Sequence, residues 1–307
     1  MVIPSIDDVF AAAKRIDGAV HRTPILTSST LNDRFGREVF FKCENFQKIG
    51  AFKARGALNA VLNLDAVSID LVTHSSGNHG AALAWAARRT NRAAYIICPS
   101  NASRFKRDAI VRYGGTLVDC GPDIVQRETA LQGFLQQRKA AFIPPYDHED
   151  IIAGQGTATL ELLEDKPQIT ELWVPIGGGG LASGAIIAAA ERCRVIGCEP
   201  ELARDAHDSL ERGARLPALP PSSIADGLLS SLGDLTFDIL HRAKTTVHLV
   251  EEDEMRTAMA LIWQTLKIVI EPSSAVPVAA ALKYGSSNSE PIGILLSGGN
   301  YMPTGYE

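Results

Sequence analysis

The sequence lacks the features that place a protein in a membrane or on a nucleic acid. No apolar run among its 307 residues reaches the roughly 20 residues of a membrane-spanning helix. The start, MVIPSIDDVFAAAKRI, has no basic segment followed by an apolar one, unlike a secretory signal. The formal net charge is −5 and charges of both signs are interspersed, so there is no basic stripe for nucleic acid. We therefore expect a cytoplasmic protein that acts on a small molecule.

Cysteine is scarce and irregularly spaced. The five cysteines form no CxxC pair, and an odd number argues against a disulfide framework. Most of them stand in apolar stretches such as YIIC and VIGC. We expect small, buried hydrophobic residues at all five positions, which are Cys43, Cys98, Cys120, Cys193 and Cys198.

Two common nucleotide-binding motifs are also missing. No GxGxxG follows the first strand with an acidic residue at the end of the next one, which argues against a nicotinamide-dependent dehydrogenase. The glycine run at residues 177–180 lacks the lysine of a GxxxxGKS or GxxxxGKT motif, which argues against a nucleoside-triphosphate P-loop.

Apolar, β-branched segments alternate with alanine-rich helical patterns along the chain. LVTHSSGNHG leads into AALAWAARR, ELWVPIGGGG leads into LASGAIIAAAE, and IGILLSGGN ends the series. Further apolar segments of the same kind are AAYIICP, TLVDC and RVIGCEP. Strands that pass directly into helices indicate an α/β fold with open parallel sheets. Because ligands bind at the carboxyl ends of such strands, the segments SSGNHG, GGGGL and SGGN are the expected place for chemistry.

Lys53 stands between Phe52 and a helix predicted to begin near Ala54. A lysine held against apolar and aromatic neighbours can have a lowered pKa and become a reactive amine. The alternative is an ordinary solvated lysine at a helix start, and this segment alone does not separate the two.

Three turns offer polar groups to an anion or a ring. The glycine run has no side chains to block its backbone and leads into a helix, which suits a phosphate better than a purely structural turn. Ser76 and Asn78 precede another helix, where they either bind an anion or cap the helix. Ser297 follows the last apolar strand and either bonds to a pyridine nitrogen or caps its turn.

Together, KIGAFKARGA, SSGNHG, GGGGL and LSGGN resemble, in order and separation, the fold-type II enzymes that use pyridoxal 5′-phosphate (PLP). Within them the chain looks most like the serine racemase and serine/threonine dehydratase group. The resemblance extends from HRTPILTSSTLN through IAGQGT and IADGL to IEPSSAV. It implies a tryptophan synthase β-like fold, in which two open parallel-sheet α/β domains hold the cofactor between them. The large, PLP-binding domain would comprise residues 1–65 and 148–307, and the small domain residues 66–147.

The resemblance also implies a cofactor site. Lys53 would hold PLP covalently, Phe52 would pack on its ring, and Asn78 would bond to the ring hydroxyl. Ser297 would meet the pyridine nitrogen. The phosphate would be held by the backbone of Gly177, Gly178, Gly179 and Gly180.

On the substrate side, the resemblance makes Ser76 a second base that faces Lys53 across the ring. Arg127, in DIVQRET, matches a position that can approach the substrate in racemases. The substrate carboxylate would be received by one turn, which contains Ser75, Ser76, Gly77, Asn78 and His79.

The segment CEPELARDA matches the divalent-cation site of the family, formed by the carboxylates of Glu199 and Asp205 and the carbonyl of Ala203. Oxygen ligands suit Mg²⁺ or Ca²⁺, and Mn²⁺ is a further choice. The alternative is a solvated acidic loop. ATP-activated racemases carry a polar residue in place of Ile49 and a glutamine in place of Ala81, so activation by ATP is not expected.

The implied function is that of a PLP-dependent ammonia-lyase, an amino-acid racemase or both. Serine or threonine would be the substrate, and a 2-keto acid and ammonia the products of elimination. A 3-hydroxyaspartate dehydratase is the nearest alternative, and Arg127 is compatible with the second carboxylate of its substrate. A PLP-binding protein without catalytic activity is a third, although it would need neither Lys53 nor Ser76 as a base. Family members are usually dimers, so we expect a homodimer.

Overall fold

The computed structural model describes residues 2–65, 69–220, 222–285 and 289–302, which form two sheets. The larger sheet has the strand order β1 (Ile25–Leu26), β2 (Val39–Cys43), β10 (Ile292–Leu296), β7 (Glu171–Pro175), β8 (Arg194–Pro200) and β9 (Val247–Val250). Only the pair of β1 and β2 is antiparallel among these described strands. The smaller sheet is parallel, with the order β5 (Thr116–Cys120), β4 (Ala94–Pro99), β3 (Asp70–His74) and β6 (Ala140–Phe142).

The predicted α/β fold with open parallel sheets is thus confirmed, although β1, β2, β6 and β9 were not anticipated. In chain order the helices are α1 (Ile6–Ile16), α2 (Ser29–Phe35), α3 (Lys53–Leu62), α4 (Asn78–Arg89), α5 (Arg104–Arg112), α6 (Ile124–Gln137), α7 (Glu149–Asp165), α8 (Gly180–Ala189), α9 (Asp205–Arg212), α10 (Asp234–Arg242), α11 (Glu252–Leu266) and α12 (Pro272–Tyr284). The described residues also form the short 3₁₀ turns η1 (Glu44–Phe46), η2 (Lys48–Gly50), η3 (Glu201–Ala203) and η4 (Asp226–Leu228).

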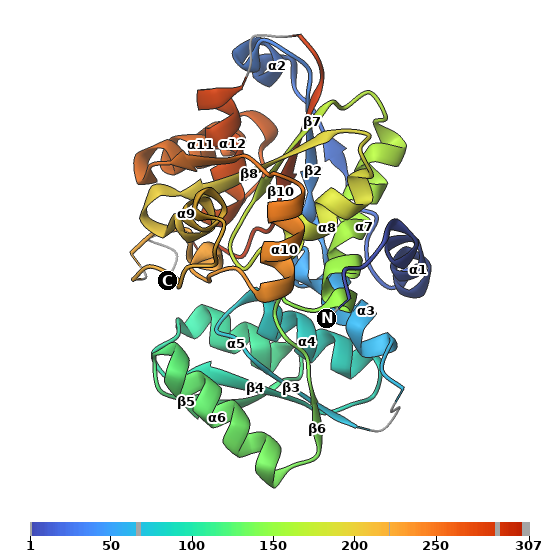
Figure 1. Ribbon diagram of the computed structural model, residues 1–307, viewed down its shortest axis with the longest axis vertical. Coiled ribbons are helices and arrows are strands. Elements are labelled where there is room, and N and C mark those ends of the chain that lie inside the picture. The colour runs from blue at the N-terminus through green and yellow to red at the C-terminus, as the bar shows by residue number, and fades with distance from the viewer. Residues whose placement is uncertain (1, 66–68, 221, 286–288, 303–307) are drawn as a thin grey trace.

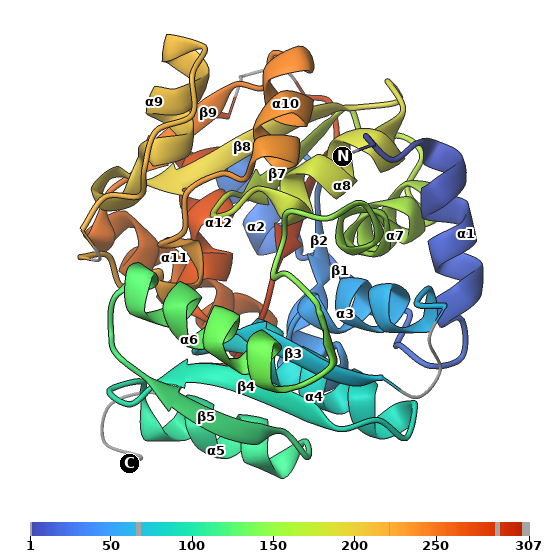
Figure 2. The same cartoon turned by 60° about the horizontal axis from the view of Figure 1, so that its bottom comes forward.

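Each sheet is covered by helices on both faces. In the smaller sheet, Leu71 packs in one core with α4 and α5, whereas the next residue, Val72, packs with Leu131 of α6. In the larger sheet, Phe41 packs with α11 and α12, whereas Phe40 packs with α7 and α8. Successive strand residues point to opposite faces, so apolar residues at both positions require two covering layers. Figures 1 and 2 show α6 across the smaller sheet from α4 and α5.

Glycines let the helices α3, α7 and α8, which lie on the side of the larger sheet, approach one another closely. A β-carbon on Gly154 of α7 would lie 2.6 Å from the α-carbon of Gly56 in α3. Likewise, a β-carbon on Gly184 of α8 would lie 2.6 Å from the backbone nitrogen of Gly156 in α7. Any larger residue would force these backbones apart, so the contacts require glycine.

The predicted domain boundaries stay a prediction. All strands of the smaller sheet lie between residues 70 and 142, and those of the larger sheet lie outside that range. The expected boundary at residue 66 falls outside the described residues.

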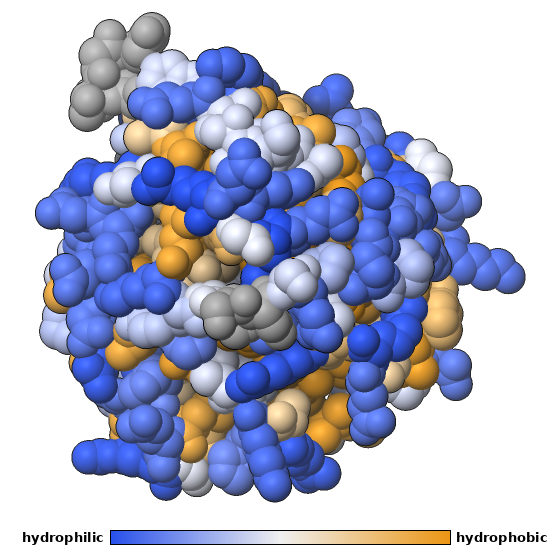
Figure 3. Space-filling view, turned by 90° about the horizontal axis from the view of Figure 1, so that it is seen from above, coloured by the Kyte–Doolittle hydropathy of each residue, from blue (hydrophilic) through white to orange (hydrophobic). Residues whose placement is uncertain are grey.

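Polar residues cover most of the face shown in Figure 3. Over the described ranges, no helix combines the length and the apolar character that a membrane crossing requires. All five cysteines are free, and Cys120 alone among them is only partly buried, so their predicted role as buried residues is largely confirmed.

Candidate active site

The carboxyl ends of β2, β7 and β10 lie at the same edge of the larger sheet because these strands are parallel. The chain passes from β2 through η1 and η2 to Lys53, the first residue of α3. The backbone N–H of Phe52 donates to the carbonyl of Ser297 at 3.0 Å, and Ala51 forms a bridge with Gly298. These backbone contacts place Lys53 beside the turn that follows β10.

Lys53 has the environment of a reactive amine. Its Nζ donates to the carbonyl oxygen of Pro145 at 2.6 Å and lies 5.1 Å from the centre of the Phe52 ring. Burial lowers the pKa of Lys53 to about 8, against the opposing charge of Glu271. The pKa shift therefore has the predicted direction, and a substantial fraction of the amine is neutral in mildly alkaline solution.

The glycine turn after β7 is enclosed by neighbours that leave no room for side chains. A β-carbon on Gly178 would lie 2.3 Å from the ring of Tyr146. Gly179 has a φ of 86°, and Thr236 Oγ1 donates to the Gly178 carbonyl at 2.8 Å. Helix α8 begins at Gly180 without a side-chain cap, so its first N–H groups are available to an anion. This cradle of backbone amides fits a phosphate.

The turn after β3 lies at the corresponding edge of the smaller sheet. Ser75 Oγ accepts a hydrogen bond from the Gly77 N–H at 3.2 Å, and Ser76 is half-buried. His79 is buried with its Nε2 3.1 Å from the Ile143 carbonyl, and burial lowers its pKa to about 3. The His79 ring is therefore neutral and hydrogen-bonded to the residue that follows β6, which leaves its backbone for the predicted role.

Asn78 connects this turn to the larger sheet. Its Nδ2 lies 3.0 and 3.2 Å from the two carboxylate oxygens of Glu271, and its Oδ1 accepts from Asn300 Nδ2 at 2.8 Å. The Asn300 N–H also donates to Glu271, at 3.2 Å. Burial raises the pKa of Glu271, although the hydrogen bond from Asn78 opposes this shift. The two sheets thus meet at Asn78.

Ser297 is buried at the end of β10. Its Oγ lies 3.1 Å from Ser274 Oγ. Ser274 Oγ also donates to the Gly298 carbonyl at 2.6 Å and accepts from the Gly298 N–H at 2.7 Å. The site therefore presents a neutral, fixed hydroxyl group at this position.

Arg127 lies near the same turn as Ser75. Burial is the main cause of the lowered pKa of His74, which directly precedes Ser75, and the charge of Arg127 lowers it further. The Nη2 of Arg127 donates to the Pro122 carbonyl at 2.9 Å, and its Nε is buried with no hydrogen-bond partner among the described residues. Arg127 lies in the first turn of α6, which follows the carboxyl end of β5, at the same edge of the smaller sheet as the turn after β3. Its predicted substrate role stays a prediction.

The predicted cation ligands cluster at the carboxyl end of β8. The oxygens of Glu199 accept the backbone N–H groups of Ala206 and His207, each at 2.9 Å. Both oxygens of Asp205 are buried without a hydrogen-bond partner in the described chain, and burial raises the pKa of Asp205 to about 6. Over the described residues, no three His, Cys, Asp or Glu side chains group as metal ligands. An unpartnered buried carboxylate nevertheless fits a cation held by two carboxylates and the Ala203 carbonyl.

Several residues at this site were not predicted from the sequence. Glu271 and Ser274 occur in IEPSSAV and Asp226 in IADGL, segments that carried the resemblance without a stated function. Asp147 accepts the backbone N–H groups of residues 234–236 and so anchors the start of α10 near the glycine turn. A carboxylate directly before a helix-initiating proline was the one sequence signal for Glu271.

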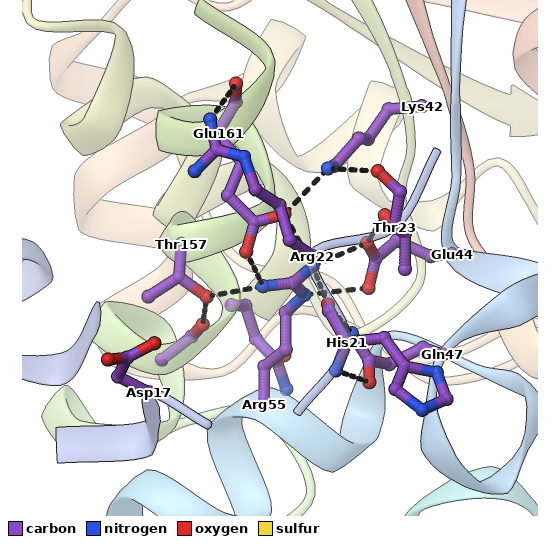
Figure 4. A network of polar contacts seen from close by, with 12 residues as sticks. Asp17, His21, Arg22, Thr23, Lys42, Glu44, Gln47, Arg55, Thr157 and Glu161 are labelled. Carbon is purple, nitrogen blue, oxygen red and sulfur yellow. Dashed lines mark hydrogen bonds and ion pairs between the residues drawn. The ribbon is translucent and has the colours of Figure 1, made fainter. Parts of the chain in front are cut away.

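A buried ionic network supports α3, the helix that begins at Lys53, and Figure 4 shows the side chains of this network. The guanidinium of Arg55 donates to Glu44 at 2.7 and 2.8 Å and to Glu161 at 2.6 and 2.9 Å. Lys42 Nζ donates to Glu161 at 2.6 Å. The Arg55 and Glu44 side chains are both 0% exposed. This network joins α3, which begins at Lys53, to β2 and α7.

Comparisons with known proteins agree with this arrangement. Residues 16–298 match a family model described as pyridoxal-phosphate dependent enzyme. The chain is 43% identical to a serine racemase from Dictyostelium discoideum, over 98% of this chain and 96% of that protein. It is 40% identical to a beta-hydroxyaspartate dehydratase from Paracoccus denitrificans, over 98% and 97% of the two chains.

A crystal structure of a threonine deaminase from T.th. superposes with a TM-score of 0.93, at 38% identity, over 98% of this chain and 100% of that one. The predicted fold-type II architecture is thereby confirmed. The match spans both sheets and every turn described above, and the chain therefore belongs to the family of fold-type II pyridoxal-phosphate-dependent enzymes.

Proposed function

We propose that this protein is a PLP-dependent ammonia-lyase, an amino-acid racemase or both, acting on small β-hydroxy amino acids. Elimination would convert L-serine to pyruvate, or L-threonine to 2-oxobutanoate, with release of ammonia. The observation that carries the proposal is Lys53, a partly buried lysine that directly follows the backbone hydrogen bond from Phe52 to Ser297 and has a pKa lowered to about 8. Relatives named as racemases and dehydratases support the same reaction class.

The site residues suggest how the cofactor would be held. The backbone amides of Gly177–Gly180 would bind the phosphate, and Phe52 would pack on the ring. Asn78 would bond to the ring hydroxyl and Ser297 to the pyridine nitrogen. Bound PLP would supply an electron sink for the bond broken at the substrate α-carbon.

Proton transfer would be the task of two side chains. Lys53 would remove the α-proton of an L-amino acid and help to protonate the leaving hydroxyl group. Ser76, from the turn after β3, would act on the opposite side of the α-carbon and so permit racemisation. A neutral Ser297 hydroxyl does not keep a pyridine nitrogen protonated as a carboxylate would, which favours elimination and racemisation over transamination.

The test is keto-acid release by the purified protein with PLP and Mg²⁺. L-Serine, L-threonine and the stereoisomers of 3-hydroxyaspartate are compared, and the chirality of residual serine is determined. Pyruvate or 2-oxobutanoate, with or without D-serine, supports the proposal. If none of these substrates is turned over, the result would indicate a PLP-binding protein without catalytic activity.

A 3-hydroxyaspartate dehydratase is the second candidate. The buried, unpartnered Nε of Arg127 near Ser75 favours it because a second substrate carboxylate could use this group. Oxaloacetate formation at far higher kcat/KM than pyruvate formation would assign this substrate and make Arg127 the first residue to replace.

Ser76→Ala is expected to separate the two reactions. Loss of a general acid–base group lowers a rate by about 10²-fold or more, so D-serine formation should fall by that factor. Elimination from L-serine, which needs only Lys53 as base, should stay within about threefold of the wild type. Pyruvate and serine chirality are measured in one assay, and an equal loss of both activities would contradict the two-base scheme.

The lowered pKa of Lys53 predicts the pH dependence of cofactor uptake. Only the neutral amine reacts, so uptake of PLP by cofactor-free protein should accelerate with pH and level off above about pH 8. With an ordinary lysine, the rate of PLP uptake would continue to rise with pH until about pH 10.4. Stopped-flow absorbance between about pH 6 and pH 10 distinguishes these curves, and a rate still rising about tenfold per unit above pH 9 would refute the shifted pKa.

We also propose that Glu199, Ala203 and Asp205 hold Mg²⁺ or a similar cation. A ligand present at about a hundred times its Kd stabilises the folded protein by about 2.7 kcal/mol, so saturating Mg²⁺ should raise the Tm. Asp205→Asn should remove this increase without lowering the Tm of the metal-free protein, because it neutralises a buried, unpartnered charge. The exposed Glu211→Gln is the control, and an unchanged response in Asp205→Asn would exclude the site.

The homodimer and the cytoplasmic location also remain proposals. Light scattering after size-exclusion chromatography tests the former, and fractionation of cells that produce the protein tests the latter.

A further inference from the structure

Two basic residues of α5 differ sharply in their surroundings. The Arg104 side chain is 95% exposed and pairs with Asp108 of the same helix. Lys106, two residues later, is only 21% exposed and pairs with Asp226 of η4. The second pair links a helix of the smaller sheet to a turn of the larger part.

Lys106 lies against the turn proposed to receive the substrate. A β-carbon placed on Gly77 would be 3.8 Å from both Cδ and Nζ of Lys106. Burial lowers the pKa of Lys106, and the charge of Glu271, which also acts on Lys53, opposes this shift. The charge of Glu271, which is hydrogen-bonded to Asn78 where the two sheets meet, thus acts on both lysines.

The two partners of the ion pair differ in what they need. Asp226 is 49% exposed, so water can solvate its carboxylate when the pair opens. The mostly buried Lys106 ammonium has much less access to water and requires an anion. A carboxylate that entered beside Gly77 could replace Asp226 as that anion. The N-terminus of α4, with no side-chain cap at Gly77, would favour negative charge at the same place.

We propose that Lys106 is a substrate-binding residue that holds the α-carboxylate of the amino acid at the N-terminus of α4. Asp226 keeps this cation paired while the site contains no substrate, and leaves it when substrate binds. This inference rests on the proposed amino-acid substrate but adds a recognition group that the backbone of the turn does not provide.

Kinetics of Lys106→Met, Lys106→Arg and Asp226→Asn in the PLP-bound enzyme test the proposal. Loss of one charge-assisted contact should raise KM for L-serine about tenfold in Lys106→Met, with kcat changed less than about threefold. Lys106→Arg should recover most of the affinity. Asp226→Asn should leave KM equal or lower because it removes a competing carboxylate. Arg104→Met, on the exposed side of the same helix, should match the wild type.

A binding measurement provides a readout without turnover. L-Alanine, which has no β-hydroxyl group to eliminate, is compared with L-alaninamide, which lacks the carboxylate, by titration of the absorbance of the bound cofactor. Lys106→Met should weaken the binding of L-alanine about tenfold and leave the affinity for L-alaninamide unchanged.

The outcomes separate the possible roles. An equal rise of KM in Lys106→Met and Asp226→Asn would show a contact that merely joins the two sheets and would overturn the proposal. The proposal would also be overturned if Lys106→Met weakened the binding of L-alanine and of L-alaninamide equally. If the wild type binds L-alanine but releases no keto acid, the proposed function fails while the titration still decides the role of Lys106.

Discussion

Lys53→Ala is expected to abolish catalysis, with a loss of at least about 10³-fold in kcat/KM. The variant loses both the group that would hold the cofactor and the group that would move the α-proton. Lys42 cannot replace it, because its buried amine is bound to Glu161 and to the Thr23 carbonyl. Keto-acid release and the visible absorbance of the PLP-treated protein are measured together, and both should disappear.

The exposed Lys139→Ala is the matched control and should behave as the wild type. Circular dichroism establishes that Lys53→Ala is folded, since removal of a desolvated amine from the first turn of α3 leaves the helix intact. Turnover or cofactor absorbance retained in the variant would refute the role of Lys53.

Arg55→Met is expected to destabilise the fold strongly. The variant leaves the wholly buried Glu44 with the Thr23 hydroxyl but without the Arg55 cation, and it removes one cation from Glu161. Breaking such a buried ion pair costs about 3–5 kcal/mol. The free energy of unfolding should fall by this amount in urea titrations. Arg22→Met is the control, because its ion pairs with Glu164 and Asp165 are about half-exposed and contribute at most about 1 kcal/mol each.

Comparable losses in the two variants would show that the Arg55 network is no more important than a surface pair. A stable Arg55→Met with reduced cofactor absorbance would instead indicate that Arg55 mainly orients α3 beneath Lys53.

Two features of the candidate site, Lys53 and the glycine run, could be predicted from short segments of the sequence. Lys53 follows an aromatic residue at a helix start, and the glycine run combines close backbone approach with a positive φ at Gly179, so both features leave a mark in a short segment. The order of strands and helices was likewise sufficient to predict parallel sheets. Both predictions rest on interactions between neighbours in the chain.

The remaining parts depend on contacts between distant segments. Glu271 meets Asn78 across 193 positions, and Arg55 meets Glu161 across 106. In the sequence, nothing distinguishes Lys106 from the exposed Arg104 of the same basic helix. The two side chains differ only because the way the two sheets meet buries one of them. The short strands β1, β6 and β9 were missed because they contain only two to four residues.

The glycine contacts of α3, α7 and α8 also determine which part of the molecule can move. Lys53 begins α3 and the glycine turn begins α8, and both helices pack against α7 through glycines at which a β-carbon would lie 2.6 Å from the neighbouring backbone. We therefore expect Lys53 and the glycine turn to keep a nearly constant separation. An opening that admits substrate is then expected to displace the smaller sheet and its helices, which carry Ser76 and Lys106.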